Sequence, residues 1–97
     1  LAHYAPKARL VLSDRLFAEC PNKLPVVVGF SNRQYPGAVR IFELAQTEDA
    51  SMAAHRLYHV LRQLDQEHIK EAWVDMRFAD TGLWKTVKER LHRAANQ

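Results

Sequence analysis

Four runs of apolar residues along the chain predict the strands of a β-sheet: residues 9–12, 26–30, 39–44 and 72–76. The second run is continuously apolar, which is typical of a strand buried on both faces of a parallel sheet, so we expect it at the centre. The third run alternates between apolar and polar positions and follows the turn signal Tyr35-Pro36-Gly37. That pattern favours an edge strand with one more exposed face.

Two longer segments repeat apolar residues at helical spacing. Thr47, followed by two acidic residues, is expected to begin a helix that continues to about Gln66, because acids favour the positive end of the helix dipole. The predicted apolar side of this helix consists of Ala50, Ala53, Ala54, Leu57, Tyr58, Leu61 and Leu64. A last helix is expected after the loop formed by residues 78–82, and its apolar stripe consists of Leu83, Trp84, Val87, Leu91 and Ala94.

A short helix is predicted between the first two strands, with Ser13 as its cap, Cys20 near its end, and Pro21 and Asn22 as its termination. The order βαββαβα, with apolar central strands, predicts a three-layer, Rossmann-like α/β sandwich of about four mostly parallel strands. We expect residues 8–97 to form this single domain.

The segment His3-Tyr4-Ala5-Pro6 is predicted to be a stiff arm that leads into the first strand. Proline fixes its own φ angle and pushes the preceding alanine toward an extended conformation. The first residue is Leu1 rather than methionine, which favours the interpretation that residues 1–7 are the end of a linker in a longer protein.

Composition narrows the class of protein. The hydrophobic share of 47% and the charged share of 26% are those of an ordinary globular domain, and no segment approaches the roughly 18 apolar residues of a membrane helix. Cys20 is the only cysteine, which excludes an intramolecular disulfide and favours a reducing cytoplasm. The net charge of +3 permits anionic partners without requiring them.

The strongest candidates for metal and catalytic chemistry have simpler explanations. His55 and His59 share one helical face at metal-binding spacing, but Arg56 replaces the glutamate of a metalloprotease motif and no third ligand is evident. A solvated helix face explains the pair, so we predict no metal site. Asp75 and Asp80 have the chemistry for acid/base work, yet an acid before a helix more often caps it.

The serines and the cysteine, which are the candidate nucleophiles, also have structural interpretations. The serines occupy no strained strand-to-helix turn, and Cys20 is expected to pack as a helical residue. The structural interpretations of Ser13 and Ser31 are a cap and a turn. We therefore assign no catalytic residue to this chain.

A ligand edge is a further candidate, formed by Gly29, Ser31 and Asn32 at the end of the predicted central strand. Open α/β sheets bind ligands outside the carboxyl ends of their strands. The glycine-rich spacing of a phosphate loop is absent, so a plain turn is the alternative. If this edge binds a ligand, the chain is a free-standing Rossmann-like module for a small anionic or nucleotide ligand.

The last helix carries a basic patch made of Lys85, Lys88, Arg90 and Arg93. Lysine and arginine contact nucleic-acid phosphates, but Glu89 interrupts the patch and no aromatic residues alternate with it, so a solvated helix end is favoured. Trp73 and Trp84 fit a strand and a helix stripe, which favours core packing over base stacking.

Three segments together carry a resemblance to a known family: HYAP at residues 3–6, AAHRLYHVLRQLD at 53–65 and DTGLWKTVKERLHRAA at 80–95. The chain resembles the C-terminal domain of the long, two-domain form of threonylcarbamoyl-AMP synthase, whose first domain is YrdC-like. Two positions depart from the family pattern: Tyr58 replaces a customary phenylalanine, and Trp84 stands where a second glycine is usual.

The resemblance implies the activity of the intact enzyme. Such a nucleotidyltransferase condenses threonine, bicarbonate and ATP into threonylcarbamoyl-AMP, which feeds threonylcarbamoyladenosine formation in tRNA. In this family, ATP, expected with magnesium, and threonine bind the YrdC-like domain. We therefore expect the C-terminal domain formed by the present chain to bind no cofactor of its own and to contact tRNA only indirectly. The resemblance also places the linker residues His3, Tyr4 and Pro6 across that active site, where we expect His3 and Tyr4 to help close it.

Overall fold

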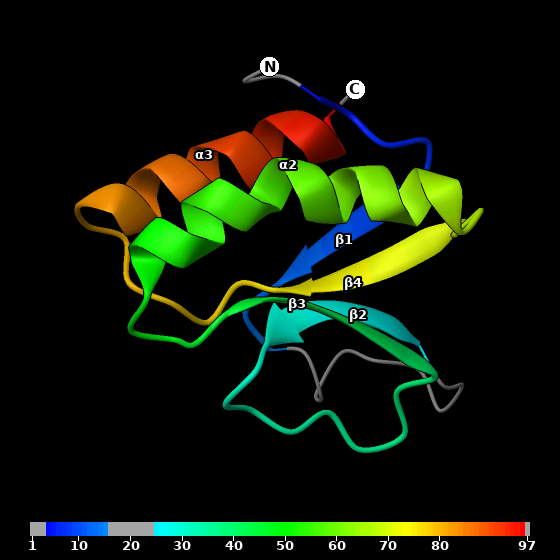
Figure 1. The fold of residues 1–97 in the computed structure, drawn as a ribbon, viewed down its shortest axis with the longest axis horizontal. Helices are drawn as coiled ribbons and strands as arrows, with labels where there is room; N and C mark the ends of the chain where they lie inside the picture. The colour runs from blue at the N-terminus through cyan, green and yellow to red at the C-terminus, as the bar shows by residue number, and fades with distance from the viewer. Residues whose placement is uncertain (1–3, 16–24, 97) are drawn as a thin grey trace.

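The computed structural model describes residues 4–15 and 25–96 of the 97-residue chain. In chain order, the elements are β1 (Arg9–Ser13), β2 (Val26–Phe30), β3 (Arg40–Ala45), α2 (Ala50–Gln66), β4 (Glu71–Asp75) and α3 (Leu83–Ala95) (Figure 1). The short helix predicted after Ser13 falls at residues that lie mainly outside the described ones. Ser13 itself ends β1, where its buried Oγ accepts the N–H of Arg15 at 3.1 Å.

The strands form one four-stranded parallel sheet in the order β1-β4-β2-β3. This arrangement confirms the predicted α/β fold with a parallel sheet and is compatible with a Rossmann-like sandwich. It also confirms that β2 is an internal strand and that β3 is an edge strand. The first and last strands of the sequence are neighbours, with Arg9 opposite Glu71 and Ser13 opposite Asp75.

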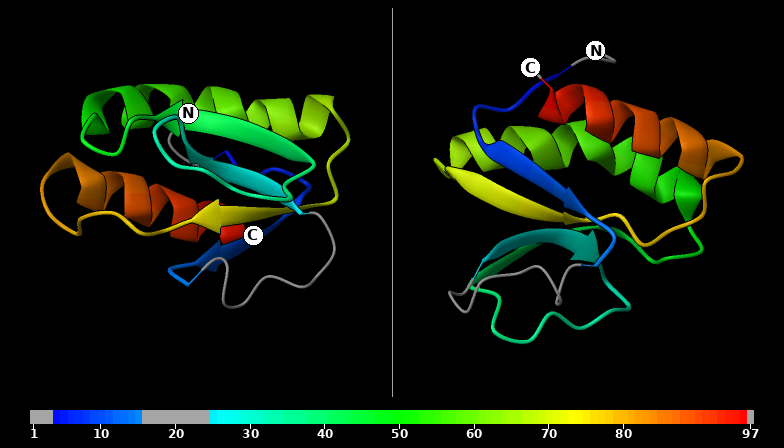
Figure 2. Two further views of the ribbon diagram at one scale, coloured as in Figure 1. Left: turned by 90° about the horizontal axis from the view of Figure 1, so that it is seen from below. Right: turned by 180° about the vertical axis from the view of Figure 1, so that it is seen from behind.

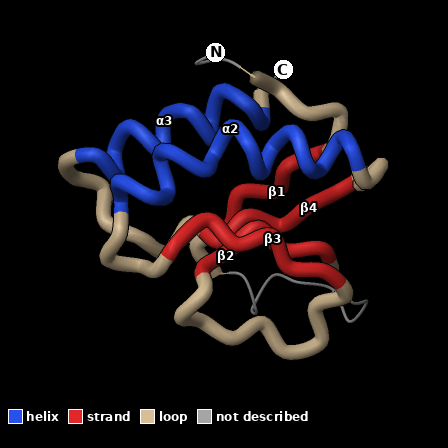
Figure 3. Tube along the Cα trace, in the orientation of Figure 1, coloured by secondary structure: helices blue, strands red, loops and turns tan. Residues whose placement is uncertain are grey.

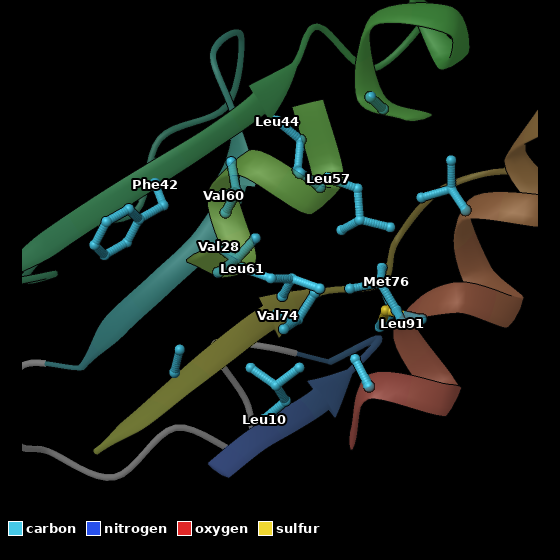
Figure 4. Close-up of a cluster of buried hydrophobic side chains, with 14 of the residues drawn as sticks. Leu10, Val28, Phe42, Leu44, Leu57, Val60, Leu61, Val74, Met76 and Leu91 are labelled. Atoms are coloured by element: carbon cyan, nitrogen blue, oxygen red, sulfur yellow. The ribbon is translucent and has the colours of Figure 1, made fainter. Parts of the chain in front are cut away.

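Both described helices cover the same face of the sheet (Figures 1 and 2). The main core lies between them and the strands, and its residues include Leu10, Val28, Phe42, Leu44, Leu57, Val60, Leu61, Val74, Met76 and Leu91 (Figure 4). The loop from β2 to β3 runs along the opposite side of the sheet (Figure 3). There Tyr35 from the loop packs on Val27, together with half-buried Ile41 and Trp73.

The two ends of α2 are formed by residues that the sequence pattern did not single out. Asp49, not Thr47, is the N-cap, because its carboxylate accepts the N–H of Met52 at 3.0 Å. At the other end, His68 adopts a left-handed conformation with φ 56°. The N–H of Ile69 donates to the carbonyl of Leu64 at 2.9 Å, which makes this a Schellman-type termination with histidine where glycine is usual.

Two residues that were predicted on the apolar faces of the helices are exposed instead. Tyr58 is 37% exposed and Leu83 is 44% exposed. α2 instead turns Val60 fully into the core, so that Tyr58 lies at the margin of the helix face. Leu83 is the first residue of α3 and precedes the first buried position, Trp84.

Candidate functional site at the docked arm and the carboxyl edge

The arm before β1 is fastened to α2 through one carboxylate. The hydroxyl of Tyr4 donates a hydrogen bond to Asp65, and the backbone N–H of Lys7 donates to Asp65 Oδ1 at 2.8 Å. The ring of Tyr4 meets the ring of Tyr58 edge-on, with 5.3 Å between centroids. Pro6 is buried. The arm is therefore held on this domain by two hydrogen bonds, one aromatic contact and an apolar contact.

Electrostatics favours this contact over most of the pH range. The hydrogen bond from Tyr4 lowers the pKa of the Asp65 carboxyl, assisted by the N–H of Lys7. The same bond raises the pKa of the Tyr4 hydroxyl. Because the two shifts favour an ionised aspartate and a neutral tyrosine, the pair is intact between the acid titration of Asp65 and the alkaline titration of Tyr4.

A second, deeper cluster lies where β2 and β4 end. Asp75 is the last residue of β4 and is fully buried. Arg77 donates to it three times, from its backbone N at 3.0 Å, its Nε at 2.8 Å and its Nη2 at 2.9 Å. The hydroxyl of Tyr35 donates at 2.7 Å, and Nη1 of Arg33 donates at 3.0 Å. One buried carboxylate thus joins β4 to the loop that follows β2.

These donors determine how Asp75 titrates. Burial alone raises the pKa of the Asp75 carboxyl, but the hydrogen bonds from Arg77, Tyr35 and Arg33 outweigh burial and lower this pKa to about 2. The carboxylate is therefore charged at all ordinary pH values. Burial and the bond to Asp75 strongly raise the pKa of Tyr35, so its hydroxyl stays a donor.

Tyr35 reaches Asp75 by crossing the backbone of β2 at Gly29. The hydroxyl of Tyr35 also accepts the N–H of Phe30 at 2.9 Å. A Cβ atom at Gly29 would lie 2.4 Å from the Tyr35 ring, so only glycine leaves room for this crossing. Gly29, predicted as part of a ligand edge, lies beneath the ring of Tyr35.

The other two residues of the predicted ligand edge lie nearby. Ser31 is exposed, and its N–H donates to the carbonyl of Ala45 at 2.9 Å. Asn32 and Thr47 exchange two hydrogen bonds: Nδ2 of Asn32 donates to Oγ1 of Thr47 at 2.8 Å, and the N–H of Thr47 donates to Oδ1 of Asn32 at 3.0 Å. The amide of Asn32 thus joins the ends of β2 and β3, and ligand binding by these residues stays a prediction.

Sequence reasoning missed Arg33, Tyr35 and Arg77. Their signal is an Arg-x-Tyr triplet just after one buried strand and an Asp-x-Arg triplet at the end of another. The two triplets meet only because β2 and β4 are neighbours, which the sequence pattern did not specify.

The remaining residues that were considered for metal binding or acid/base chemistry, His55, His59 and Asp80, lie at exposed positions. His55 and His59 are exposed, and the described residues contain no cluster of three or more histidine, cysteine or acidic side chains suited to a metal ion. Asp80 is exposed and does not cap α3, whose N-cap is Gly82 with φ 58°. In the described part of the chain, neither helix has the length and apolar character needed to cross a membrane.

The basic patch of α3 and the tryptophans have structural contacts. Lys88 is half-buried, with its ammonium 5.1 Å from the centroid of the Phe78 ring. Trp84 is buried against Phe30 and Phe78, with ring centroids 5.8 Å and 5.0 Å away, which agrees with its predicted core role. Trp73 is half-buried on the other face of the sheet.

Comparison with protein families provides the decisive observation. Residues 1–96 match the family model described as threonylcarbamoyl-AMP synthase, C-terminal domain. The chain belongs to this family. The family resemblance of the three sequence segments is thereby confirmed, and the match spans residues 1–96 of the 97-residue chain. Comparisons with curated proteins and with solved structures found no match.

Proposed function

We propose that this chain is the accessory C-terminal domain of a threonylcarbamoyl-AMP synthase and that it positions the linker to the catalytic domain. The family match supports the association with this enzyme. The observation that carries the positioning role is the arm, in which Tyr4 and Lys7 are both bonded to Asp65 of α2. Residues 1–7 are then the end of the linker and residues 8–97 the accessory domain.

In this proposal, chemistry takes place on the YrdC-like domain of the same polypeptide. That domain takes threonine, bicarbonate and ATP with magnesium, and its product is used for tRNA modification in the cytoplasm. The accessory C-terminal domain supplies no catalytic residue and no cofactor site, and its contact with tRNA is indirect. Its contribution is mechanical: a movement of the domain carries the linker with it.

The arm contacts assign different parts to the linker residues. Tyr4 directs its hydroxyl toward Asp65, so we assign it an anchoring part. Pro6 is buried and restricts the backbone that follows Tyr4. His3 precedes the anchor and is the residue that we propose to contribute to closing the neighbouring active site. Fixing the arm in advance lowers the entropy lost when the linker covers that site.

The test is steady-state kinetics of a full-length synthase that carries this domain, with Asp65→Ala compared with Asp80→Ala. Asp80 is a matched control because it is exposed and does not cap α3. We expect Asp65→Ala to raise the KM for ATP and threonine several-fold with a smaller change in kcat, because the linker loses its anchor while the catalytic groups stay in place.

Two further variants separate anchoring from simple structural damage. Asp65→Asn keeps an oxygen that accepts the N–H of Lys7 and places an amide NH2 group beside the Tyr4 hydroxyl, which can accept from it, so the KM should lie between those of Asp65→Ala and the parent enzyme. The double variant His3→Ala, Tyr4→Ala should raise KM at least as much as Asp65→Ala. Unchanged kinetics in both Asp65→Ala and the double variant would refute the positioning role.

A further inference from the structure

We propose that the carboxyl edge of the sheet carries an oxyanion-binding site, formed by the guanidinium group of Arg33 beside the ion pair of Arg77 with Asp75, for a phosphate or carboxylate group of a small ligand. This site is separate from the docked arm and is not needed for the positioning role proposed above. It also differs from the edge predicted from Gly29, Ser31 and Asn32. The ring of Tyr35 covers Gly29, and the N–H of Ser31 and the amide of Asn32 bond to Ala45 and Thr47.

The position of the two arginines is the first argument. β2 and β4 are neighbours in the sheet. The chain leaves β2 on the side away from the helices and leaves β4 toward α3 on the helical side (Figures 1 and 3). In open α/β sheets, ligands bind beyond the carboxyl ends of adjacent parallel strands whose connections diverge. Arg33 and Arg77 follow these two strand ends.

The hydrogen bonds at Asp75 are the second argument. A carboxylate offers about four lone-pair sites. The backbone N, Nε and Nη2 of Arg77 and the hydroxyl of Tyr35 already supply four donors. Nη1 of Arg33 is a fifth donor, and it shares Oδ2 with two others. The four other donors are therefore enough to occupy the lone-pair sites of Asp75, and the hydrogen bond from Arg33 is not required for this.

The unused donors of Arg33 are the third argument. Its side chain is 29% exposed, and its guanidinium lies 5.2 Å from the centroid of the Phe30 ring. Within residues 4–15 and 25–96, the structure gives its Nε and Nη2 no acceptor. Guanidinium groups bind phosphate and carboxylate through two parallel N–H donors, and these two atoms form such a pair.

Charge and rigidity complete the argument. The formal charges of Arg33, Arg77 and Asp75 sum to +1. Asp75 holds both arginine side chains in position, and Phe30 supports one of them from the side. Prior fixation of long side chains reduces the entropy lost on binding. A small oxyanion therefore meets cationic groups that are already oriented.

The experiment is an NMR titration of the 97-residue chain, with arginine Nε–H resonances as the probe. Inorganic phosphate, pyrophosphate and acetate are added separately at constant ionic strength, with chloride as the balancing anion. We expect a saturable shift of the Arg33 resonance. A shift with phosphate and pyrophosphate alone assigns the site to phosphate groups, and a comparable shift with acetate assigns it to oxyanions in general.

Variants make the result specific to this cluster. Arg33→Gln should weaken binding at least tenfold while the circular dichroism spectrum and the melting temperature change little, because Arg77 and Tyr35 still satisfy Asp75. Arg33→Lys keeps the charge and loses the paired donors, so its affinity should be intermediate. Arg90→Gln, at an exposed position on α3, is the matched control and should bind as the parent chain does. Shifts that do not saturate, or that are equal in Arg33→Gln and Arg90→Gln, would overturn the proposal. Either result is independent of the kinetics of Asp65 variants.

Discussion

Two tyrosine–aspartate pairs join distant parts of this chain, and they differ in depth. Tyr4 donates to Asp65 on the half-exposed surface of α2, while Tyr35 donates to Asp75, which is fully buried. Asp65 has a backbone N–H as its other donor, whereas Asp75 also receives two guanidinium groups. The same pair of functional groups is thus built once with water as a competitor and once without it.

The difference follows from the cost of burying a charge. A carboxylate removed from water must be compensated by enough donors to occupy its lone pairs, and leaving the buried charge without them carries a large penalty. When a carboxylate near water loses one hydrogen-bond donor, a water molecule can take the place of that donor, so the cost is small. We therefore interpret the Asp75 cluster as a permanent connection between β4 and the loop that follows β2, and the Asp65 contact as a weaker connection between the arm and α2.

The largest expected effect separates the two aspartates. Asp75→Asn leaves Arg33 and Arg77 near an uncharged group and should lower the free energy of unfolding by about 3–5 kcal/mol. Asp65→Asn should change it far less, because water replaces the lost interaction. Urea denaturation of both variants measures the contrast. Equal losses for the two substitutions would show that depth does not distinguish the pairs.

Gly29→Ala tests the route by which Tyr35 reaches Asp75. The added methyl group lies 2.4 Å from the Tyr35 ring and must displace it, which should cost about 1–3 kcal/mol of stability. If displacement of the ring is the cause, Gly29→Ala should cost little in a chain that already carries Tyr35→Ala. Additive losses in this double-mutant cycle would locate the strain elsewhere.

The acid limb of stability tests the charge on Asp75. The pKa of this carboxyl is lowered in the folded chain from 3.8 to about 2, so its contribution is complete above pH 3.8 and is lost as the pH falls toward 2. The loss amounts to about 2 kcal/mol. In Arg77→Gln the pKa of Asp75 should rise and the pH dependence become shallower, as denaturation between pH 5 and pH 2 measures. Asp80→Asn serves as the control, and a shallower slope in that variant as well would contradict the assignment to Asp75.

The smallest expected effect concerns the surface pair. Tyr4→Phe removes the donor that lowers the pKa of Asp65, so this pKa should move up toward its ordinary value, while the urea midpoint stays nearly constant. A carbon-detected NMR titration of the Asp65 carboxyl measures the shift. Tyr58→Phe keeps the donor and is the control. A pKa that is the same in Tyr4→Phe and the parent chain would show that the arm does not depend on this bond.

The sequence pattern predicted those features that follow from burial along one element. Val26–Phe30 was expected at the centre because it is uninterrupted and apolar, and the end of the long helix at Gln66 was expected from its periodicity; both predictions are confirmed. The choice of Thr47 as the helix start was wrong, because Thr47 bonds to Asn32 from another strand end.

The candidate sites were harder to predict, since they depend on which strands are neighbours. Asp75 and Arg33 are 42 positions apart in the sequence and come together through the pairing of β4 with β2. Tyr4 and Asp65 are 61 positions apart. In a single sequence Asp75 is one polar residue at a strand end, and nothing local signals five donors around it. The linker role of Tyr4 came from the family resemblance and not from its pattern.

The placement of β1 beside β4 has a consequence for synthesis of the chain. Among the strands of the described residues, β1 pairs with β4 alone, so this pairing cannot form until the ribosome has released residues 71–75. Pairings between segments this far apart in sequence form slowly, because a long loop must close first. The edge formed by β1 is therefore expected to be among the last parts of the nascent domain to assemble.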